Sequence, residues 1–134
     1  MKPAPFQYSA PKSLREALSI LAEHGYDAKP LAGGQSLIPT MNFRLAQPGL
    51  LVDLNNIPDL SYVRLGSDGS LHIGAMTRHS TVERDPLVAQ YAPLLHETMP
   101  HISHRQIRNR GTIGGSLAHA DPAVAALFDD GAGE

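Results

Sequence analysis

The chain has 134 residues, 42% hydrophobic and 18% charged, a balance typical of one globular domain rather than of a disordered segment. Its formal charge is −2 with the histidines neutral, which argues against general binding to nucleic acid, and it has no cysteine for disulfides, thiolate metal sites or thiol catalysis. No apolar run is long enough to span a membrane, and the N-terminus has no apolar signal-peptide segment, so we expect a soluble, cytoplasmic protein.

The clearest predicted helix begins after Ser13. Ser13 and Glu16 have the spacing of a capping box, and Gly25 supplies a stop with positive φ. The apolar residues between them recur at helical spacing and predict one buried face, made of Leu14, Ala17, Leu18, Leu21 and Ala22.

Strand signals surround this helix. Phe6 and Tyr8 alternate as in a short edge strand, residues 28–32 form a second short strand, and residues 50–54 are apolar enough for a buried strand. A second helix is expected over about residues 37–44. Strand and helix signals therefore alternate, which predicts a small α/β subdomain.

The middle of the chain changes character. Residues 62–65 and 70–75 flank an Asp-Gly turn at residues 68–69 and predict a β-hairpin. Short helices are expected over residues 77–84 and 93–101, separated by prolines.

Two glycine pairs carry the strongest chemical signal. Ala32-Gly33-Gly34-Gln35-Ser36 is expected where a strand ends and a helix begins, and the segment from Thr112 to Ser116 offers a second pair flanked by hydroxyls. Glycine permits positive φ and a close approach of backbone N–H groups to a ligand, and such donors suit a phosphate. One such pair alone is more simply a tight turn, but two indicate loops that meet on one diphosphate. Neither segment matches the Rossmann or phosphate-loop patterns.

The segments around these glycines resemble a known family. Leu31-Ala32-Gly33-Gly34-Gln35-Ser36-Leu37-Ile38-Pro39 and the run from Gln106 to Pro122 resemble the two flavin motifs of the FAD-binding medium subunits of molybdenum hydroxylases. This group includes carbon monoxide dehydrogenase, xanthine dehydrogenase and dehydrogenases of N-heterocycles. Residues 51–54 and 73–77 also fit, and the resemblance covers about residues 1–124.

The resemblance implies an α+β fold of the vanillyl-alcohol-oxidase (PCMH) type. It implies an N-terminal α/β subdomain over 1–55, a partial second α+β subdomain over 56–124 and a divergent tail over 125–134, with FAD held between the subdomains. The residues that it implies at the diphosphate and ribityl chain are Ala32, Gly33, Gly34, Gln35, Ser36, Thr112, Ile113, Gly114, Gly115 and Ser116.

The implied function is electron transfer. A molybdopterin-binding large subunit would oxidise the substrate, a [2Fe–2S] small subunit would relay the electrons, and FAD on this chain would pass them to an external acceptor. The absence of cysteine agrees with this division, because this chain cannot ligate a cluster. The alternatives are a fragment that no longer holds FAD and serves as a non-catalytic interaction module, and, more remotely, an unrelated nucleotide-binding module.

Two departures from the family pattern affect the cofactor. The family has an acidic residue where this chain has Ala125, and Asp129 and Asp130 come too late to replace it. The family pattern also stops near Val124, as in a truncated copy. We therefore expect weak FAD binding by this chain alone.

Other polar residues have simpler interpretations. His101 and His104 lack the further ligands of a metal site, so no metal is expected. Arg105, Arg108 and Arg110 are expected to form a solvated face that meets a partner subunit or the phosphates, not nucleic acid.

Overall fold

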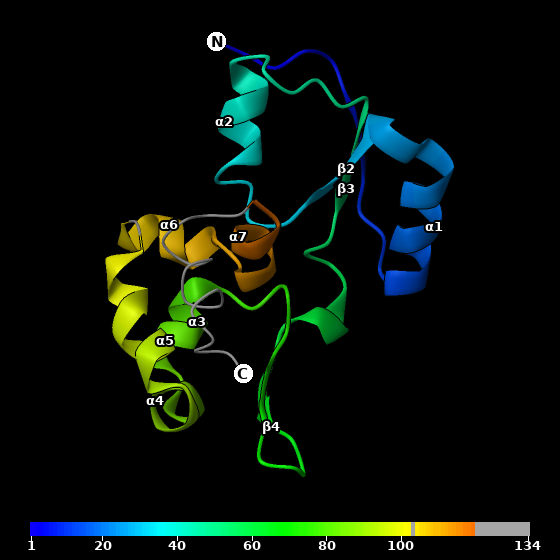
Figure 1. Cartoon of the computed structure of the whole chain (residues 1–134). Coiled ribbons are helices and arrows are strands. Elements are labelled where there is room, and N and C mark those ends of the chain that lie inside the picture. Colours follow the sequence, from blue (N-terminus) through cyan, green and yellow to red (C-terminus); the bar gives the residue numbers. More distant parts are fainter. Residues whose placement is uncertain (103, 120–134) are drawn as a thin grey trace. The chain divides into compact units, whose positions relative to one another are not determined.

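A computed structural model of the chain describes residues 1–102 and 104–119. By its internal contacts the chain divides into two compact units, Met1–Pro58 and Asp59–Glu134 (Figure 1). The division falls close to the predicted subdomain boundary after residue 55.

The first unit is built on a parallel three-stranded sheet. Strand β3 (Leu50–Asp53) lies between β1 (Gln7–Ser9) and β2 (Ala28–Leu31), with Ser9 opposite Val52 and Leu31 opposite Asp53. Residues 50–52 are at most 6% exposed, as expected for a central strand. All three strands appear where the sequence predicted them.

Helix α1 (Leu14–His24) begins and ends as predicted. The Ser13 hydroxyl accepts a hydrogen bond of 3.2 Å from the Glu16 amide. Gly25 has φ +57° and its N–H donates to the Leu21 carbonyl. The structure confirms the Ser13 cap and the Gly25 stop, but the predicted capping box is only half formed, because the Glu16 carboxylate accepts from the Lys12 amide at 3.3 Å and not from that of Ser13.

The predicted buried face of α1 is only partly correct. Ala17 is 1% exposed, but Leu14 and Leu18 are 47% and 56% exposed. The helix contacts β2 and β3. The fully buried position of this face is therefore a small alanine, and the two leucines beside it are left largely open to solvent.

Two short helical segments complete this unit. A 3-10 helix, η1 (Gly25–Asp27), leads into β2, and α2 (Leu37–Asn42) follows it. Helix α2 is shorter than the predicted 37–44 because Arg44 adopts φ +58°, which ends helical backbone geometry.

The chain passes from the first unit to the second within the 3-10 helix η2 (Pro58–Leu60), and the predicted hairpin follows. Strands β4 (Val63–Leu65) and β5 (Leu71–Ile73) pair antiparallel, and Gly69 takes φ +86° in the turn between them. Asp68 accepts hydrogen bonds from the Ser70 amide and hydroxyl, which lower the pKa of its carboxyl.

Five short helices follow the hairpin within the described residues. They are α3 (His79–Arg84), α4 (Pro86–Tyr91), α5 (Pro93–Thr98), α6 (Arg105–Arg110) and α7 (Ile113–His119), with the 3-10 helix η3 (Met99–His101) after α5. Helices α4, α6 and α7 were not predicted, and α7 begins within the second glycine motif, which the sequence analysis took as a loop. The sequence analysis took Pro86 as a separator, whereas it is the first residue of α4, where the Asp85 carboxylate accepts from the Leu87 amide at 2.9 Å. A proline at this position lacks only an N–H that no helical carbonyl would accept.

These helices enclose the core of the second unit. The buried cluster consists of Val82, Val88, Met99, Ile102 and Ile113, each at most 6% exposed. Each member comes from a different segment, since α3, α4, η3, the residue after η3, and α7 supply one residue apiece.

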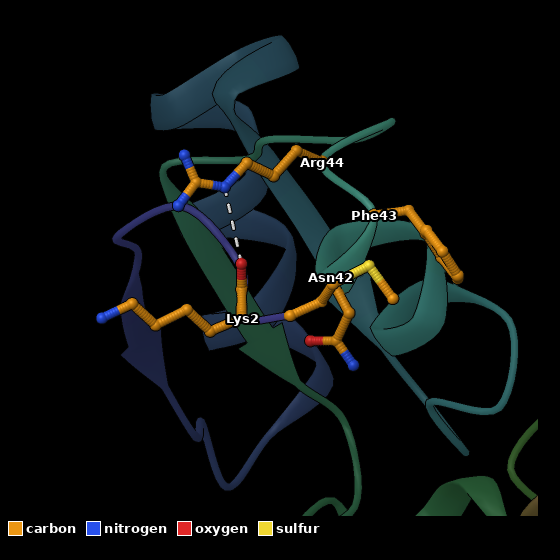
Figure 2. A pocket seen from close by; sticks show the side chains of 5 residues that line it. Lys2, Asn42, Phe43 and Arg44 are labelled. Carbon is orange, nitrogen blue, oxygen red and sulfur yellow. Dashed lines mark hydrogen bonds between the residues drawn. The ribbon is translucent and has the colours of Figure 1, made fainter.

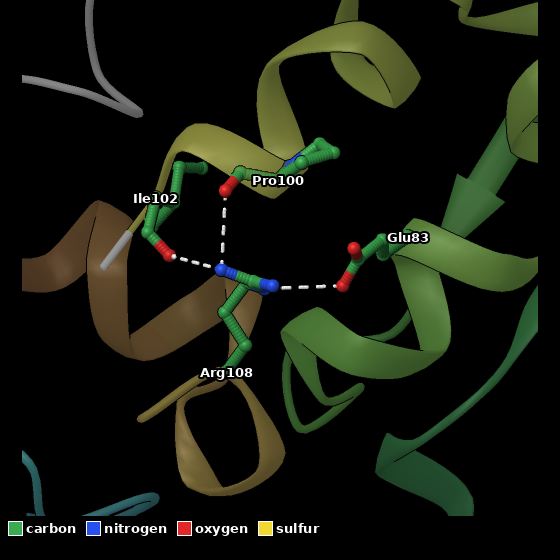
Figure 3. Close-up of polar contacts among 4 residues, drawn as sticks. All are labelled: Glu83, Pro100, Ile102 and Arg108. Atoms are coloured by element: carbon green, nitrogen blue, oxygen red, sulfur yellow. Dashed lines mark hydrogen bonds and ion pairs between the residues drawn. The ribbon is translucent and has the colours of Figure 1, made fainter. Parts of the chain in front are cut away.

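Arg108 corrects the prediction of a solvated arginine face. It is 8% exposed, and its Nε lies 3.1 Å from Glu83 Oε2. Its Nη1 donates to the carbonyls of Pro100 and Ile102 at 3.2 and 3.4 Å (Figure 3). This guanidinium therefore joins α6 to α3 and to the end of η3. Arg105 and Arg110, by contrast, are exposed.

In the described ranges, no helix has the length and apolar character that a membrane span requires.

Candidate functional site

The first glycine motif connects the end of β2 to the start of α2. Residue 32 directly follows Leu31, which is paired with Asp53 at the carboxyl ends of two adjacent parallel strands. Ligands of open parallel sheets bind at this edge. Gly34 has φ +77°, and a Cβ added to it would lie 3.2 Å from Ile38 Cγ1. The positive φ therefore favours glycine here, and an added side chain would press on Ile38.

The amides of this first motif are available to a ligand. Among the described residues, the N–H groups of residues 33–36 donate to no other group of the protein. The Ser36 hydroxyl likewise makes no capping bond to α2. The Gln35 side chain donates to the Gly33 carbonyl at 3.4 Å. A loop that presents several amides and a hydroxyl is a donor set suited to a phosphate group, so these residues fit the diphosphate of FAD.

A polar network fastens this motif to the sheet. Asn55 Nδ2 donates to the Ala32 carbonyl at 2.9 Å and to Asp53 Oδ1 at 2.6 Å. The hydroxyl of Tyr8 donates to Asp53 Oδ2. The sequence analysis did not single out Asn55, because its contact with residue 32 exists only once β2 and β3 pair.

The second glycine motif uses its amides differently. The N–H groups of Ile113 and Gly114 donate to the Thr77 and Ala75 carbonyls at 3.1 and 2.8 Å. The Gly115 amide donates to Thr112 Oγ1 at 3.1 Å. These amides are satisfied within the protein and Thr112 is buried, so the Ser116 hydroxyl is the polar group of this motif that remains for a ligand.

Gly114 is also required for packing within the protein. A Cβ added to it would lie 2.8 Å from both the Cβ and the carbonyl oxygen of Ala75. Its φ is not positive, so the glycine is needed for a close approach to the neighbouring backbone. Thr112 and Ile113 are buried, at 2% and 6% exposure, whereas Ser116 is half-buried. Its hydroxyl lies 2.9 Å from Nε2 of the buried His79.

The first motif belongs to the first unit, and the second motif to the second unit. That both motifs contact one diphosphate remains a prediction. Ala125, Asp129 and Asp130, on which the predicted loss of a carboxylate depends, lie outside the described residues.

A separate hollow lies at the opposite end of α2 from the first motif. It has a volume of about 300 Å³ and is lined by Met1, Lys2, Asn42, Phe43 and Arg44 (Figure 2). Arg44 Nε donates to the Lys2 carbonyl across it at 3.5 Å. None of the ten predicted cofactor-binding residues lines this hollow.

The described residues form no cluster of side chains that could bind a metal ion. Over residues 1–102 and 104–119, no three histidine, aspartate or glutamate side chains gather closely enough to hold an ion.

Comparison with known proteins identifies the family. Residues 4–128 match the family described as "FAD binding domain in molybdopterin dehydrogenase". The chain is 52% identical over 124 residues to the 6-hydroxypseudooxynicotine dehydrogenase complex subunit alpha of Paenarthrobacter nicotinovorans, covering 92% of this chain and 42% of that protein. It is 49% identical over 123 residues to the carbon monoxide dehydrogenase medium chain of Hydrogenophaga pseudoflava, covering 91% and 42%.

The structural likeness agrees with the sequence match. A solved structure of carbon monoxide dehydrogenase from Hydrogenophaga pseudoflava that lacks the Mo-pyranopterin moiety of its cofactor superposes with a TM-score of 0.88 at 48% identity. The match covers 91% of this chain and 42% of that one. The chain therefore belongs to the FAD-binding domain family of molybdopterin dehydrogenases, and its cofactor is FAD. It spans about two-fifths of the length of these relatives.

Proposed function

We propose that this chain is the FAD-binding, electron-transferring component of a molybdopterin-dependent dehydrogenase or hydroxylase. Its partners would be a molybdopterin-binding large subunit and a [2Fe–2S] small subunit, and electrons would leave FAD for an external acceptor. The observation that carries the proposal is the first glycine motif of a chain that belongs to an FAD-binding family. This motif is a loop at the carboxyl end of a parallel strand, and its N–H groups donate a hydrogen bond to no other group among the described residues.

The relatives support the wider assignment. The names of the two relatives compared above are those of a dehydrogenase complex subunit and of a medium chain, which supports a role as one oxidoreductase subunit among several. The match to carbon monoxide dehydrogenase supports the PCMH-type fold that the sequence resemblance implies. We also propose a cytoplasmic location, as the sequence analysis expected.

The chain's own residues would bind and orient the cofactor. In the first motif, the amides of residues 33–36 and the Ser36 hydroxyl would donate to the diphosphate. In the second motif, the half-buried Ser116 hydroxyl would donate, since the neighbouring amides are already bonded and Thr112 is buried. FAD supplies the redox chemistry when bound, so no side chain of this chain has to act as an acid or a base.

The test compares two glycine variants. Gly34→Ala places an alanine at φ +77° in the first motif, and Gly25→Ala places one at φ +57° at the end of α1. A left-handed backbone costs an alanine roughly 1–2 kcal/mol relative to glycine, so both variants should lose stability. Only Gly34→Ala should also displace the phosphate-binding amides, and we expect it to weaken FAD binding about tenfold.

FAD affinity is measured by the change in flavin fluorescence during titration of the purified 134-residue chain. Saturable binding by the wild type, lost selectively in Gly34→Ala, supports the proposal. A wild type that does not bind FAD would favour the non-catalytic alternative, and equal affinities of the two variants would show that the first motif is not the binding loop.

A further inference from the structure

A buried histidine lies directly against the second glycine motif. His79 is the first residue of α3 and is 3% exposed. Its Nε2 lies 3.0 Å from the Thr112 carbonyl oxygen and 2.9 Å from Ser116 Oγ. The sequence analysis did not single it out, because 33 residues separate it from Thr112.

The chemistry of these partners determines where the imidazole proton lies. A carbonyl oxygen only accepts, so Nε2 has to carry the hydrogen that makes this contact. The same N–H then faces the Ser116 hydroxyl, which accepts from it. The hydroxyl hydrogen of Ser116 is consequently directed away from the histidine and is available to an external acceptor.

The backbone holds the ring in this position. The His79 amide donates to the Gly111 carbonyl at 2.9 Å. The two neighbouring residues, Arg78 before His79 and Thr112 after Gly111, are paired in an antiparallel β-bridge. A Cβ on Gly111 would lie 3.1 Å from Nδ1 and 3.2 Å from Cε1 of the ring, so the imidazole packs directly on the glycine. The Thr112 carbonyl also accepts the Ser116 amide at 3.1 Å. The Thr112 carbonyl oxygen therefore accepts hydrogen bonds both from His79 and from the Ser116 amide of helix α7.

We propose that His79 is a positioning residue of the cofactor site: its Nε2–H holds the Thr112 carbonyl and the Ser116 hydroxyl and turns the hydroxyl hydrogen of Ser116 toward an anionic acceptor. This inference rests on the proposed function, in which that acceptor is a phosphate oxygen of FAD. It gives the second motif a specific donor, although its Gly114 and Gly115 amides are already bonded within the protein.

The first experiment needs no cofactor. Nitrogen-15 NMR of the unliganded 134-residue chain reports which ring nitrogen of His79 is protonated. A proton on Nε2 is the expected result. An unprotonated Nε2 would overturn the inference, because the Thr112 contact could not then be a hydrogen bond.

The second experiment measures FAD affinity by fluorescence titration in variants of His79. His79→Leu removes the donor and should weaken binding about tenfold or more, whereas His79→Gln offers an amide N–H at a similar reach and should stay within about threefold of the wild type. His104→Leu is the matched control, since His104 is exposed and its side chain makes no cap bond to α6. Melting temperatures without FAD separate a folding defect from a binding defect.

A Ser116→Ala substitution completes the test. It should weaken FAD binding in the wild type but have little further effect in His79→Leu, because the two residues act through one hydroxyl. Fully additive losses, or wild-type affinity in His79→Leu, would overturn the inference. If the wild type itself fails to bind FAD, the proposed function fails, and the NMR result still decides whether Nε2 of His79 carries the proton that the inference requires.

Discussion

The substitution Arg108→Met tests how strongly one buried guanidinium joins the helices of the second unit. Methionine keeps the length and flexibility of the side chain but removes all of its donors. Glu83 would lose its ion pair at 3.1 Å, and the carbonyls of Pro100 and Ile102 would lose the donor that reaches both of them.

The magnitude follows from the burial of the two partners. Breaking a fully buried ion pair costs about 3–5 kcal/mol, because the remaining charge stays in a poor solvent. Here the Arg108 side chain is 10% exposed and that of Glu83 is 24% exposed, so water partly solvates the carboxylate that remains. We therefore expect a loss of about 2–3 kcal/mol in the free energy of unfolding, or a melting temperature lower by about 10 °C for a domain of this size.

Thermal unfolding followed by circular dichroism measures this loss. Arg105→Met is the matched control, since Arg105 is an exposed arginine of the same helix, and its effect should stay within about 0.5 kcal/mol. Adding Glu83→Leu to Arg108→Met should recover part of the stability, because it removes the unpaired carboxylate. Equal losses in the two single arginine variants would refute the reasoning.

Two further predictions concern pKa values. The hydrogen bond from Tyr8 to Asp53 raises the pKa of the Tyr8 hydroxyl. This bond therefore stabilises the fold fully below the ordinary tyrosine pKa, and the stabilisation is lost as the pH rises through the raised pKa. The difference between ultraviolet titrations of the wild type and Tyr8→Phe should show that Tyr8 ionises at a higher pH than an ordinary tyrosine, and Asp53→Asn should abolish this delay. The Ser70 hydroxyl and amide lower the pKa of the Asp68 carboxyl. The Asp68 carboxylate therefore stabilises the fold above the ordinary aspartate pKa and ceases to do so as the pH falls through the lowered pKa. Ser70→Ala should move the midpoint of the Asp68 NMR titration to higher pH, and an unchanged midpoint would contradict this cause.

Local signals predicted most of the secondary structure. The cap at Ser13, the stop at Gly25 and the turn at Gly69 each depend on residues within a few positions of one another, and all three are present in the structure. The β3 strand was also evident, because a central parallel strand is apolar throughout. Predictions that depended on tertiary packing were less accurate: Leu18 is exposed although it is on the predicted apolar face, and Arg108 is buried although it lies in a basic cluster.

The amino-acid sequence by itself determined the family and the two glycine motifs, because the motifs are contiguous and require small residues at fixed positions. Only the tertiary structure decided which polar groups of those motifs a ligand can reach. In the first motif the amides of residues 33–36 donate to no other described group, whereas in the second motif Gly114 donates to Ala75. That bond joins segments about 40 residues apart and leaves no local pattern, so two similar glycine pairs come to offer different donors, amides in the first and the Ser116 hydroxyl in the second.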